Sequence, residues 1–339
     1  MLNELALFAG IGGIPLALRP WCRTVCYVEI NPFRRRVLRA RMAGGQLDWA
    51  PIENDVEKFD ARPWAGKIDI ITAGFPCQDI SAAGGGAGLE GKHSRLFWEI
   101  VRIAALLRAP WLFLENSPLT PTRVGLAVAG SLAQIGYLEG RTGILSAEDV
   151  GARHLRERWW ALAHRPGTRA GKIPAGPWPE RQGTPDLIGG ALPFGGGREM
   201  RLPTAKSSPS GPDYARAARP RSGGDDLVTS LHRLPSGAAR DTRSGKGRKD
   251  NGHSPQLPEA LGGKINPDWE ELFFGYPPGW TDPERLDLEP FPGFHLDPWG
   301  LPYLANGMPD QNQRIAAIGD AAVPEQAREA FARLMGIAT

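Results

Sequence analysis

The sequence predicts an α/β protein with a doubly wound, mostly parallel sheet, and three observations support this. Short apolar runs alternate with longer amphipathic segments through residues 1–164. A glycine cluster follows the first apolar run, and an acidic residue ends the second. Strands that alternate with helices pair in parallel, with helices on both faces of the sheet, and such sheets bind ligands at the carboxyl ends of their strands.

Each element follows from its local pattern. Mainly apolar runs predict buried strands at residues 5–8, 25–28, 68–73, 111–114 and 159–162. Helical periodicity between these runs predicts helices at residues 33–42, 96–107 and 124–135. Residues 324–335 predict a final helix, because Pro324 suits its first turn.

Residues 165–305 differ in texture from the rest of the chain. From Arg165 to Lys264, 17 Lys and Arg stand against 9 Asp and Glu, whereas the whole chain has a net charge of only +3. This stretch is rich in Gly and Pro, which predicts a small irregular domain with local disorder at residues 207–221 and 240–254. Its charge favours a polyanionic partner, and an ordinary solvated loop region is the alternative.

Composition and cysteine content restrict which classes of protein the chain can belong to. The chain has 339 residues, 41% of them apolar, which is enough for a sizeable core. We expect a soluble, intracellular protein, because no run approaches the roughly 20 apolar residues of a membrane helix and no signal-peptide layout is present. Cys22, Cys26 and Cys77 predict reduced thiols, and no second Cys/His pair stands at zinc-site spacing, so no metal site is expected.

The glycine cluster and two acidic residues predict a cofactor that contains adenosine. Residues 5–13, LALFAGIGG, would let the backbone pass close to a bound molecule after the first strand. Glu29 ends the next strand, where a carboxylate accepts hydrogen bonds from a ribose diol, and Asp55 follows a third strand, where it can hold an adenine amine. Considered alone, the glycine cluster could be an ordinary tight turn, and Glu29 and Asp55 could each be an ordinary surface charge.

Cys77 is the candidate nucleophile. It follows Pro76 at the end of a strand and is followed by polar side chains and a glycine-rich loop. A thiolate is a strong nucleophile when its surroundings lower the thiol pKa, and the loop could close over a substrate. The alternative is a buried small hydrophobic residue, which the polar neighbours disfavour.

Four blocks in order resemble those of the DNA (cytosine-5) methyltransferases. The blocks are FAGIGG at residues 8–13, GFPCQ at 74–78, LEN at 114–116 and RER at 156–158, and the match resumes at residues 313–324. The resemblance implies a class I S-adenosylmethionine-dependent methyltransferase fold of Rossmann type. It also implies three regions: a catalytic and cofactor-binding domain at 1–164, a target-recognition region at 165–305, and a C-terminal segment at 306–339 that returns to the catalytic domain.

The same resemblance assigns the chemistry. Cys77 would attack C6 of a cytosine flipped out of double-stranded DNA, and C5 would then take the methyl group. Glu115 would hold N3 and share its proton, and Arg158, together with Arg156, would brace the pyrimidine carbonyl. The substrate side would also include Gln78, Ser81 and Asn116.

The resemblance also implies the cofactor and the partners. S-adenosylmethionine would be held by Phe8, Ala9, Gly10, Gly12, Gly13, Glu29, Ile30, Asp55, Val56, Pro76, Leu96, Asp320 and Ala322. The enzyme would act as a monomer on double-stranded DNA in the cytoplasm of a prokaryotic or phage-infected cell, with a cognate restriction endonuclease as a further partner.

Four positions depart from the family pattern. Ala6 replaces an acidic residue, which removes a hydrogen bond on the cofactor side, and Ser117 and His154 replace the usual valine and glutamine. Asp320 replaces an asparagine, and its carboxylate is expected to repel a cofactor that itself carries a carboxylate.

Rival functions are weaker. A zinc nucleobase deaminase needs Pro-Cys-x-x-Cys, and Ile80 occupies the place of its second cysteine. Thymidylate synthase also attacks C6 with a cysteine, but it has no use for the glycine cluster and Glu29. A catalytically silent DNA-binding relative and a cytosine modifier with an altered cofactor remain as alternatives.

Overall fold

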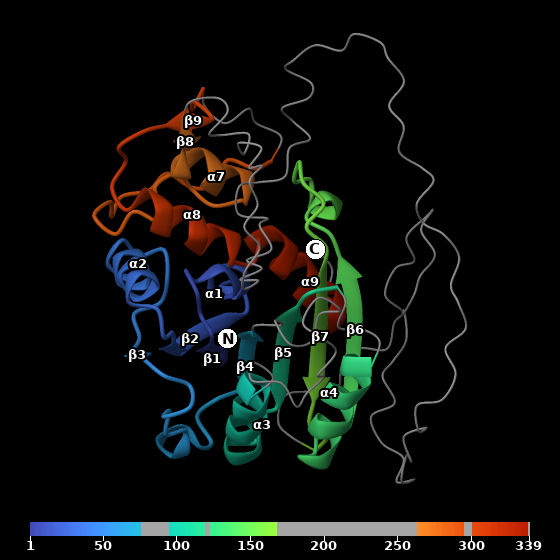
Figure 1. The fold of residues 1–339 in the computed structure, drawn as a ribbon. Coiled ribbons are helices and arrows are strands. Elements are labelled where there is room, and N and C mark those ends of the chain that lie inside the picture. The colour runs from blue at the N-terminus through green and yellow to red at the C-terminus, as the bar shows by residue number, and fades with distance from the viewer. Residues whose placement is uncertain (76–94, 119–122, 168–262, 295–299, 338–339) are drawn as a thin grey trace, which may run out of the picture.

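A seven-stranded sheet forms the centre of the described chain (Figure 1). The computed structural model describes residues 1–75, 95–118, 123–167, 263–294 and 300–337. The sheet has the order β3-β2-β1-β4-β5-β7-β6. Its strands are β1 (Leu2–Leu7), β2 (Cys22–Val28), β3 (Ile52–Glu53), β4 (Ile70–Gly74), β5 (Trp111–Asn116), β6 (Glu139–Leu145) and β7 (Arg158–His164). All five predicted strands are confirmed, as β1, β2, β4, β5 and β7.

The sheet is parallel except at one edge. β1 pairs in parallel with β2 and β4, β2 with β3, and β4 with β5, whereas β7 runs antiparallel to β5 and β6. The mostly parallel sheet is therefore confirmed, but β7 departs from the strand–helix rule. The chain between β6 and β7 turns back on itself through the 3-10 turn η4 (Glu148–Val150), with Ala147 N donating to Leu155 O, and it contains no crossover helix. The sequence analysis missed β6 because Gly140 and Gly143 interrupt its apolar pattern.

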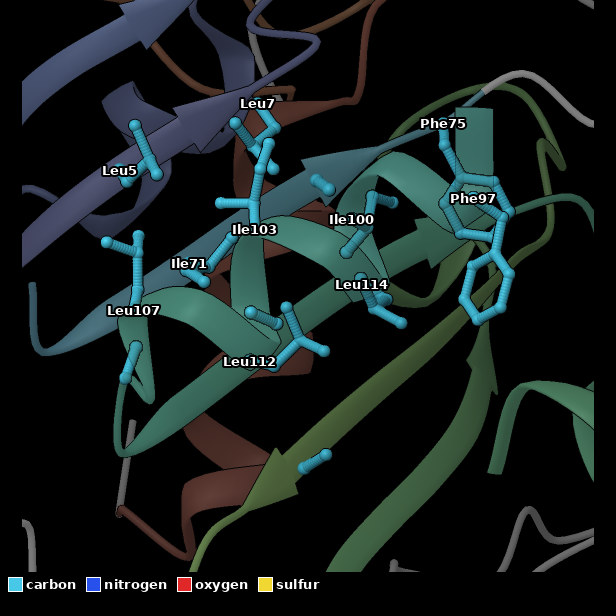
Figure 2. Close-up of a cluster of buried hydrophobic side chains, with 14 of the residues drawn as sticks. Leu5, Leu7, Ile71, Phe75, Phe97, Ile100, Ile103, Leu107, Leu112 and Leu114 are labelled. Atoms are coloured by element: carbon cyan, nitrogen blue, oxygen red, sulfur yellow. The ribbon is translucent and has the colours of Figure 1, made fainter. Parts of the chain in front are cut away.

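Helices cover both faces of the sheet, as predicted. They are α1 (Gly13–Leu18), α2 (Pro32–Ala43), α3 (Arg95–Leu107), α4 (Arg123–Gln134), α7 (Pro267–Phe273), α8 (Gln311–Gly319) and α9 (Pro324–Met335), and the 3-10 turn η1 (Arg62–Trp64) precedes β4. On one face, α3 and α4 pack on the apolar side chains of β1, β4 and β5. Figure 2 shows Ile100, Ile103 and Leu107 of α3 against Leu5 and Leu112.

The opposite face is covered by α1 and α9. Ile14 and Leu18 of α1 pack with Phe331 and Leu334 of α9 on the strands, where Phe113 is fully buried. α9 begins at Pro324, as predicted, and ends at Gly336, whose positive φ of 71° closes the helix in a conformation that glycine adopts without strain. None of the helices in the described ranges has the length and apolar character needed to cross a membrane.

The segment that follows residue 262 returns to this core. Phe274, Tyr276 and Trp280 are buried with Ile11 and Ile318, while β8 (Lys264–Ile265) and β9 (Leu304–Ala305) form a separate two-stranded sheet. The described residues 263–294 of the predicted 165–305 region thus pack with the N-terminal part of the chain. The two stretches predicted to be locally disordered lie outside the described residues.

A buried carboxyl group lies at the centre of the sheet. Glu4 is fully buried, and it accepts hydrogen bonds from the hydroxyls of Thr24 at 2.5 Å and Thr72 at 2.6 Å. Burial, which outweighs these two bonds, raises the pKa of Glu4 from 4.5 to about 7, and nearby Asp48 adds to the rise. Folding therefore favours the protonated form of Glu4.

Glu4→Gln should remove a pH dependence of stability. Because the folded-state pKa is raised, the stability of the wild type should be full below pH 4.5 and should fall as pH rises through 7. The amide carries no charge, so the variant should be more stable than the wild type at pH 8 by ~2–3 kcal/mol and equal to it at pH 4. Urea unfolding at both pH values measures this, with the exposed Glu53→Gln as control. Parallel pH profiles for wild type and Glu4→Gln would contradict the assignment.

Candidate active site

A cleft of about 620 Å³ opens at the carboxyl edge of the sheet. Phe8 follows β1, Glu29 follows β2 and Asp55 follows β3, while Gly74 ends β4 and Glu115 lies in β5, and all five line the cleft. Parallel strands end at one edge, so residues far apart in sequence meet there (Figure 1). The volume is in the range of small-molecule and cofactor sites, roughly 300–1,000 Å³.

The loop after β1 has a backbone that requires glycine. Gly10 and Gly12 have φ values of 58° and 87°. A Cβ on Gly13 would lie 2.2 Å from the Tyr276 hydroxyl oxygen and 2.7 Å from Ala322 O, so no side chain fits there. Trp280 Nε1 donates to Ile11 O at 2.9 Å and fixes the loop from the other side. The glycines therefore serve close packing against the C-terminal segment as well as access to the cleft.

Glu29 is held rigidly beneath this loop. Its Oε2 accepts from Gly10 N at 2.7 Å and its Oε1 from Asn31 N at 2.8 Å. Burial raises the pKa of Glu29, an effect opposed by these bonds and by Arg34 and Arg35. Each carboxylate oxygen keeps a second acceptor position, so Glu29 can still accept hydrogen bonds from a diol in the cleft.

Glu115 and Arg158 form an ion pair on the other side of the cleft. Arg158 Nε lies 2.9 Å from Glu115 Oε1, and both side chains are largely shielded from solvent. A Cβ at residue 74 would come within 2.9 Å of Glu115 Oε2, so Gly74 leaves the room that the carboxylate occupies. The antiparallel direction of β7 creates this pair, because it brings the first residue of that strand to the carboxyl edge.

Arg156 holds a backbone turn. Its Nη2 donates to Gly319 O at 2.8 Å and to Ala321 O at 2.7 Å, and the guanidinium carbon lies 4.9 Å from the centre of the Phe274 ring. Burial, together with the charge of Arg158, lowers the pKa of Arg156 to about 9. These contacts give Arg156 a structural role in addition to its place in the cleft wall.

His154, one of the departures from the family pattern, connects this segment to α7. Burial, assisted by the charges of Arg156 and Arg158, lowers its pKa to about 4, so the ring is neutral near pH 7. Its Nε2–H donates to Phe273 O at 3.0 Å, and the ring stacks on Phe274.

Asp320, whose carboxylate was expected to repel the cofactor, forms an ion pair in the structure. Arg34 in the first turn of α2 forms an ion pair with Asp320, and both side chains line the cleft. Sequence reasoning missed Arg34, because no motif surrounds it. Ala6, where the family has an acidic residue, is buried and lines a small cavity of about 40 Å³ together with Thr72 and Glu115.

The cleft brings together most of the described predicted site residues. Those lining it are Phe8, Gly10, Glu29, Ile30, Asp55, Val56, Leu96, Glu115, Arg156, Arg158 and Asp320. Ala9, Gly13 and Ala322 line the small adjacent cavity instead. Gly12 packs toward Leu47, and Asn116 bonds to the backbone at Phe75 O and Ser117 N. Pro76, Cys77, Gln78 and Ser81 lie outside the described residues.

Two of the three cysteines are unsuited to nucleophilic chemistry. Cys22 and Cys26 are buried in the core, 2% and 0% exposed. Burial raises the pKa of Cys26 to about 12 and that of Cys22 still further. A thiol that remains protonated is a poor nucleophile, so Cys77 is the remaining candidate.

Comparisons with known proteins show which family the chain is similar to. The family model described as C-5 cytosine-specific DNA methylase matches residues 2–192. Type II methyltransferase M.CviJI of Paramecium bursaria Chlorella virus IL3A is 39% identical over 164 residues, which are 48% of this chain and 43% of the relative. M2.BsuMI of Bacillus subtilis is 33% identical over 145 residues, 40% of this chain and 35% of the relative. The matches thus span less than half the length of these relatives.

A solved structure supports the fold. The crystal structure of a Spodoptera frugiperda DNMT2 mutant superposes with a TM-score of 0.53 over 98% of this chain and 99% of that chain, at 14% identity. At that identity the likeness concerns the fold alone.

Arg156→Ala should destabilise the protein. The change removes the donor to both Gly319 O and Ala321 O and the contact with Phe274, so the free energy of unfolding should fall by about 2–3 kcal/mol. Urea denaturation measures this, with the exposed Arg153→Ala expected to stay within about 0.5 kcal/mol of wild type. Equal stability of Arg156→Ala and wild type would mean that Arg156 does not hold the turn.

Proposed function

The chain belongs to the C-5 cytosine-specific DNA methylase family, and we propose that it transfers a methyl group from S-adenosylmethionine to C5 of cytosine in double-stranded DNA. The observation that carries this proposal is a single cleft with two kinds of wall. One side holds the Glu115–Arg158 ion pair, and the other holds Glu29 beneath the glycine loop. A base and an adenosine cofactor could thus meet within one site.

The residues of the second wall fit the cofactor. Glu29 and Asp55 offer carboxylate acceptors for ribose hydroxyls and an adenine amine, and Phe8, Val56 and Leu96 offer apolar surface to the adenine ring. When bound, S-adenosylmethionine supplies an electrophilic methyl group.

Cys77 is the proposed nucleophile. Its thiolate would form a bond from Sγ to C6 of the cytosine, and the electron pair of the C5–C6 double bond would move into the ring and make C5 nucleophilic. After methyl transfer, the C5 proton would leave to a base, the double bond would re-form and the thiolate would be expelled. The burial of Cys22 and Cys26 supports this assignment by elimination.

Glu115 would act on the other edge of the same ring. Its Oε1 is engaged by Arg158 Nε, while Oε2 lies beside Gly74, where no side chain obstructs it. Glu115 would exchange a proton with N3 as charge develops in the ring during thiolate addition, a task for general acid–base catalysis. Arg158 would orient the carboxylate and brace the pyrimidine oxygen.

DNA would be read by the basic region. Residues 165–305 stay our candidate for target recognition, because the positive charge of the chain is concentrated in residues 165–264 of this region. The target cytosine would have to leave the duplex to reach the cleft, at a cost of a few kcal/mol. The similarity to Type II methyltransferases favours a cognate restriction endonuclease as a partner of the same system.

A covalent trap tests the nucleophile. In the presence of S-adenosylmethionine, DNA substituted throughout with 5-fluorocytosine should form a stable adduct with wild-type protein, because fluorine at C5 cannot leave as a proton does. Denaturing gels should show the adduct in wild type, Cys22→Ala and Cys26→Ala, and should not show it in Cys77→Ser. Absence of the adduct in wild type would favour the catalytically silent DNA-binding alternative.

Glu115→Gln tests the acid–base role. The variant should bind DNA like wild type but lower the single-turnover rate of methyl transfer by roughly 10²–10⁴-fold. Rapid quench with a radiolabelled methyl donor measures the rate, and the exposed Glu148→Gln on η4 is the matched control. An unchanged rate in Glu115→Gln would remove this residue from the chemistry.

A further inference from the structure

Arg34 differs from the other arginines that line the cleft in the described chain. Arg156 is engaged by the backbone of residues 319 and 321, and Arg158 is engaged by Glu115. Arg34 is paired with Asp320, whose side chain is 67% exposed. An ion pair with one well-hydrated member can exchange partners at low cost, because solvent already screens it.

Both members of this pair are fixed at the backbone. Arg34 lies in the first turn of α2, where Asn31 Oδ1 accepts from Arg34 N at 3.2 Å and caps the helix. Asp320 follows α8 as its C-cap, and the two bonds from Arg156 hold the residues on either side of it. The pair therefore places one cation and one anion at defined positions in the cleft wall.

The position of the pair within the cleft indicates which end of a ligand it would meet. Asp320 lines both the cleft and the adjoining small cavity, where Gly10, Ile11 and Gly13 of the glycine loop also lie. The carboxylate of Asp55, which is proposed for the adenine side, lines the cleft but not the small cavity. Asp320 thus lies at the end of the cleft next to the glycine loop, and Arg34, which lines only the cleft, is brought to that end by its ion pair with Asp320.

A free carboxylate at this position would be unfavourable. Asp320 stands at the C-terminus of α8, where the helix dipole opposes negative charge. Arg34 compensates for that charge and at the same time presents a guanidinium to the cleft. The combination matches a zwitterion, which has one group for each member of the pair.

We propose, on the basis of the function proposed above, that Arg34 is a specificity-determining residue that binds the α-carboxylate of the cofactor while Asp320 accepts from its α-ammonium group. Binding replaces one ion pair with two and leaves no charge unpaired. A ligand without the amino-acid end leaves the Arg34–Asp320 pair as it is and gains nothing from it.

Equilibrium binding to the full chain tests the proposal, with three adenosine ligands. S-adenosylhomocysteine carries both charged groups, its decarboxylated analogue carries only the ammonium, and 5′-methylthioadenosine carries neither. Arg34→Ala should weaken S-adenosylhomocysteine about tenfold or more, because it removes a charge-assisted hydrogen bond. The affinity of 5′-methylthioadenosine should stay within about twofold, since Arg34 would not contact it, and that of the decarboxylated analogue should not fall, because its ammonium would still meet Asp320.

Arg36→Ala is the matched control. Arg36 lies on the same helix and pairs with Asp310 at the other end of α8, but it does not line the cleft. Its substitution should leave all three affinities unchanged. An equal loss for all three ligands in Arg34→Ala would mean a structural role and would overturn the proposal, as would an unchanged affinity for S-adenosylhomocysteine.

The double variant Arg34→Ala/Asp320→Asn separates direct contact from simple neutralisation. If Arg34 only offsets the charge of Asp320, removing both charges should restore wild-type affinity for S-adenosylhomocysteine, which would overturn the proposal. Direct contact predicts that the double variant stays weak. If wild type binds none of the three ligands, the proposed cofactor itself is wrong. If wild type and Arg34→Ala bind S-adenosylhomocysteine equally well, only the role of Arg34 is wrong.

Discussion

The buried carboxylate of Glu271 determines the geometry on which the rest of the site depends. It is fully buried in α7 and accepts hydrogen bonds from the backbone N–H groups of Gly279, Trp280 and Thr281, from the Thr281 hydroxyl and from Arg314. Breaking a buried pair of this kind costs about 3–5 kcal/mol, because it leaves a charge without compensation. That is a large share of the roughly 5–15 kcal/mol by which domains are stable.

Two aromatic residues connect the segment that Glu271 holds to the cleft. Trp280 bonds to Ile11 O in the glycine loop, and Tyr276 donates its hydroxyl to Ala322 O beside Asp320. The C-terminal segment therefore positions both the loop beneath the proposed cofactor and the turn that Arg156 holds. The C-terminal stretch, although distant in sequence, thus packs with residues of the N-terminal part of the chain at the cleft.

Charge pairing is the common principle of the cleft. Glu115 is paired with Arg158, Asp320 with Arg34, and Glu29 is held by two backbone N–H groups. Each group is thereby oriented before any ligand arrives, which limits the reorganisation that binding or catalysis would require. Glu4 lies away from the cleft: within the described ranges it has two hydroxyl donors and no cation partner, so its burial favours the neutral form.

Periodicity and motif order in the sequence determined the alternation of strands and helices, the edge of the sheet where Phe8, Glu29 and Glu115 meet, and the family resemblance. These properties are local, because the pattern of apolar residues over a short stretch indicates which face of a strand or helix is buried. Only the tertiary structure decided the antiparallel direction of β7, the burial of Cys22 and Cys26, and the pairing of Arg34 with Asp320 across 286 positions. Such features depend on how elements pack together in space, and no short pattern around Arg34 or Asp320 indicates which distant charge will lie beside it.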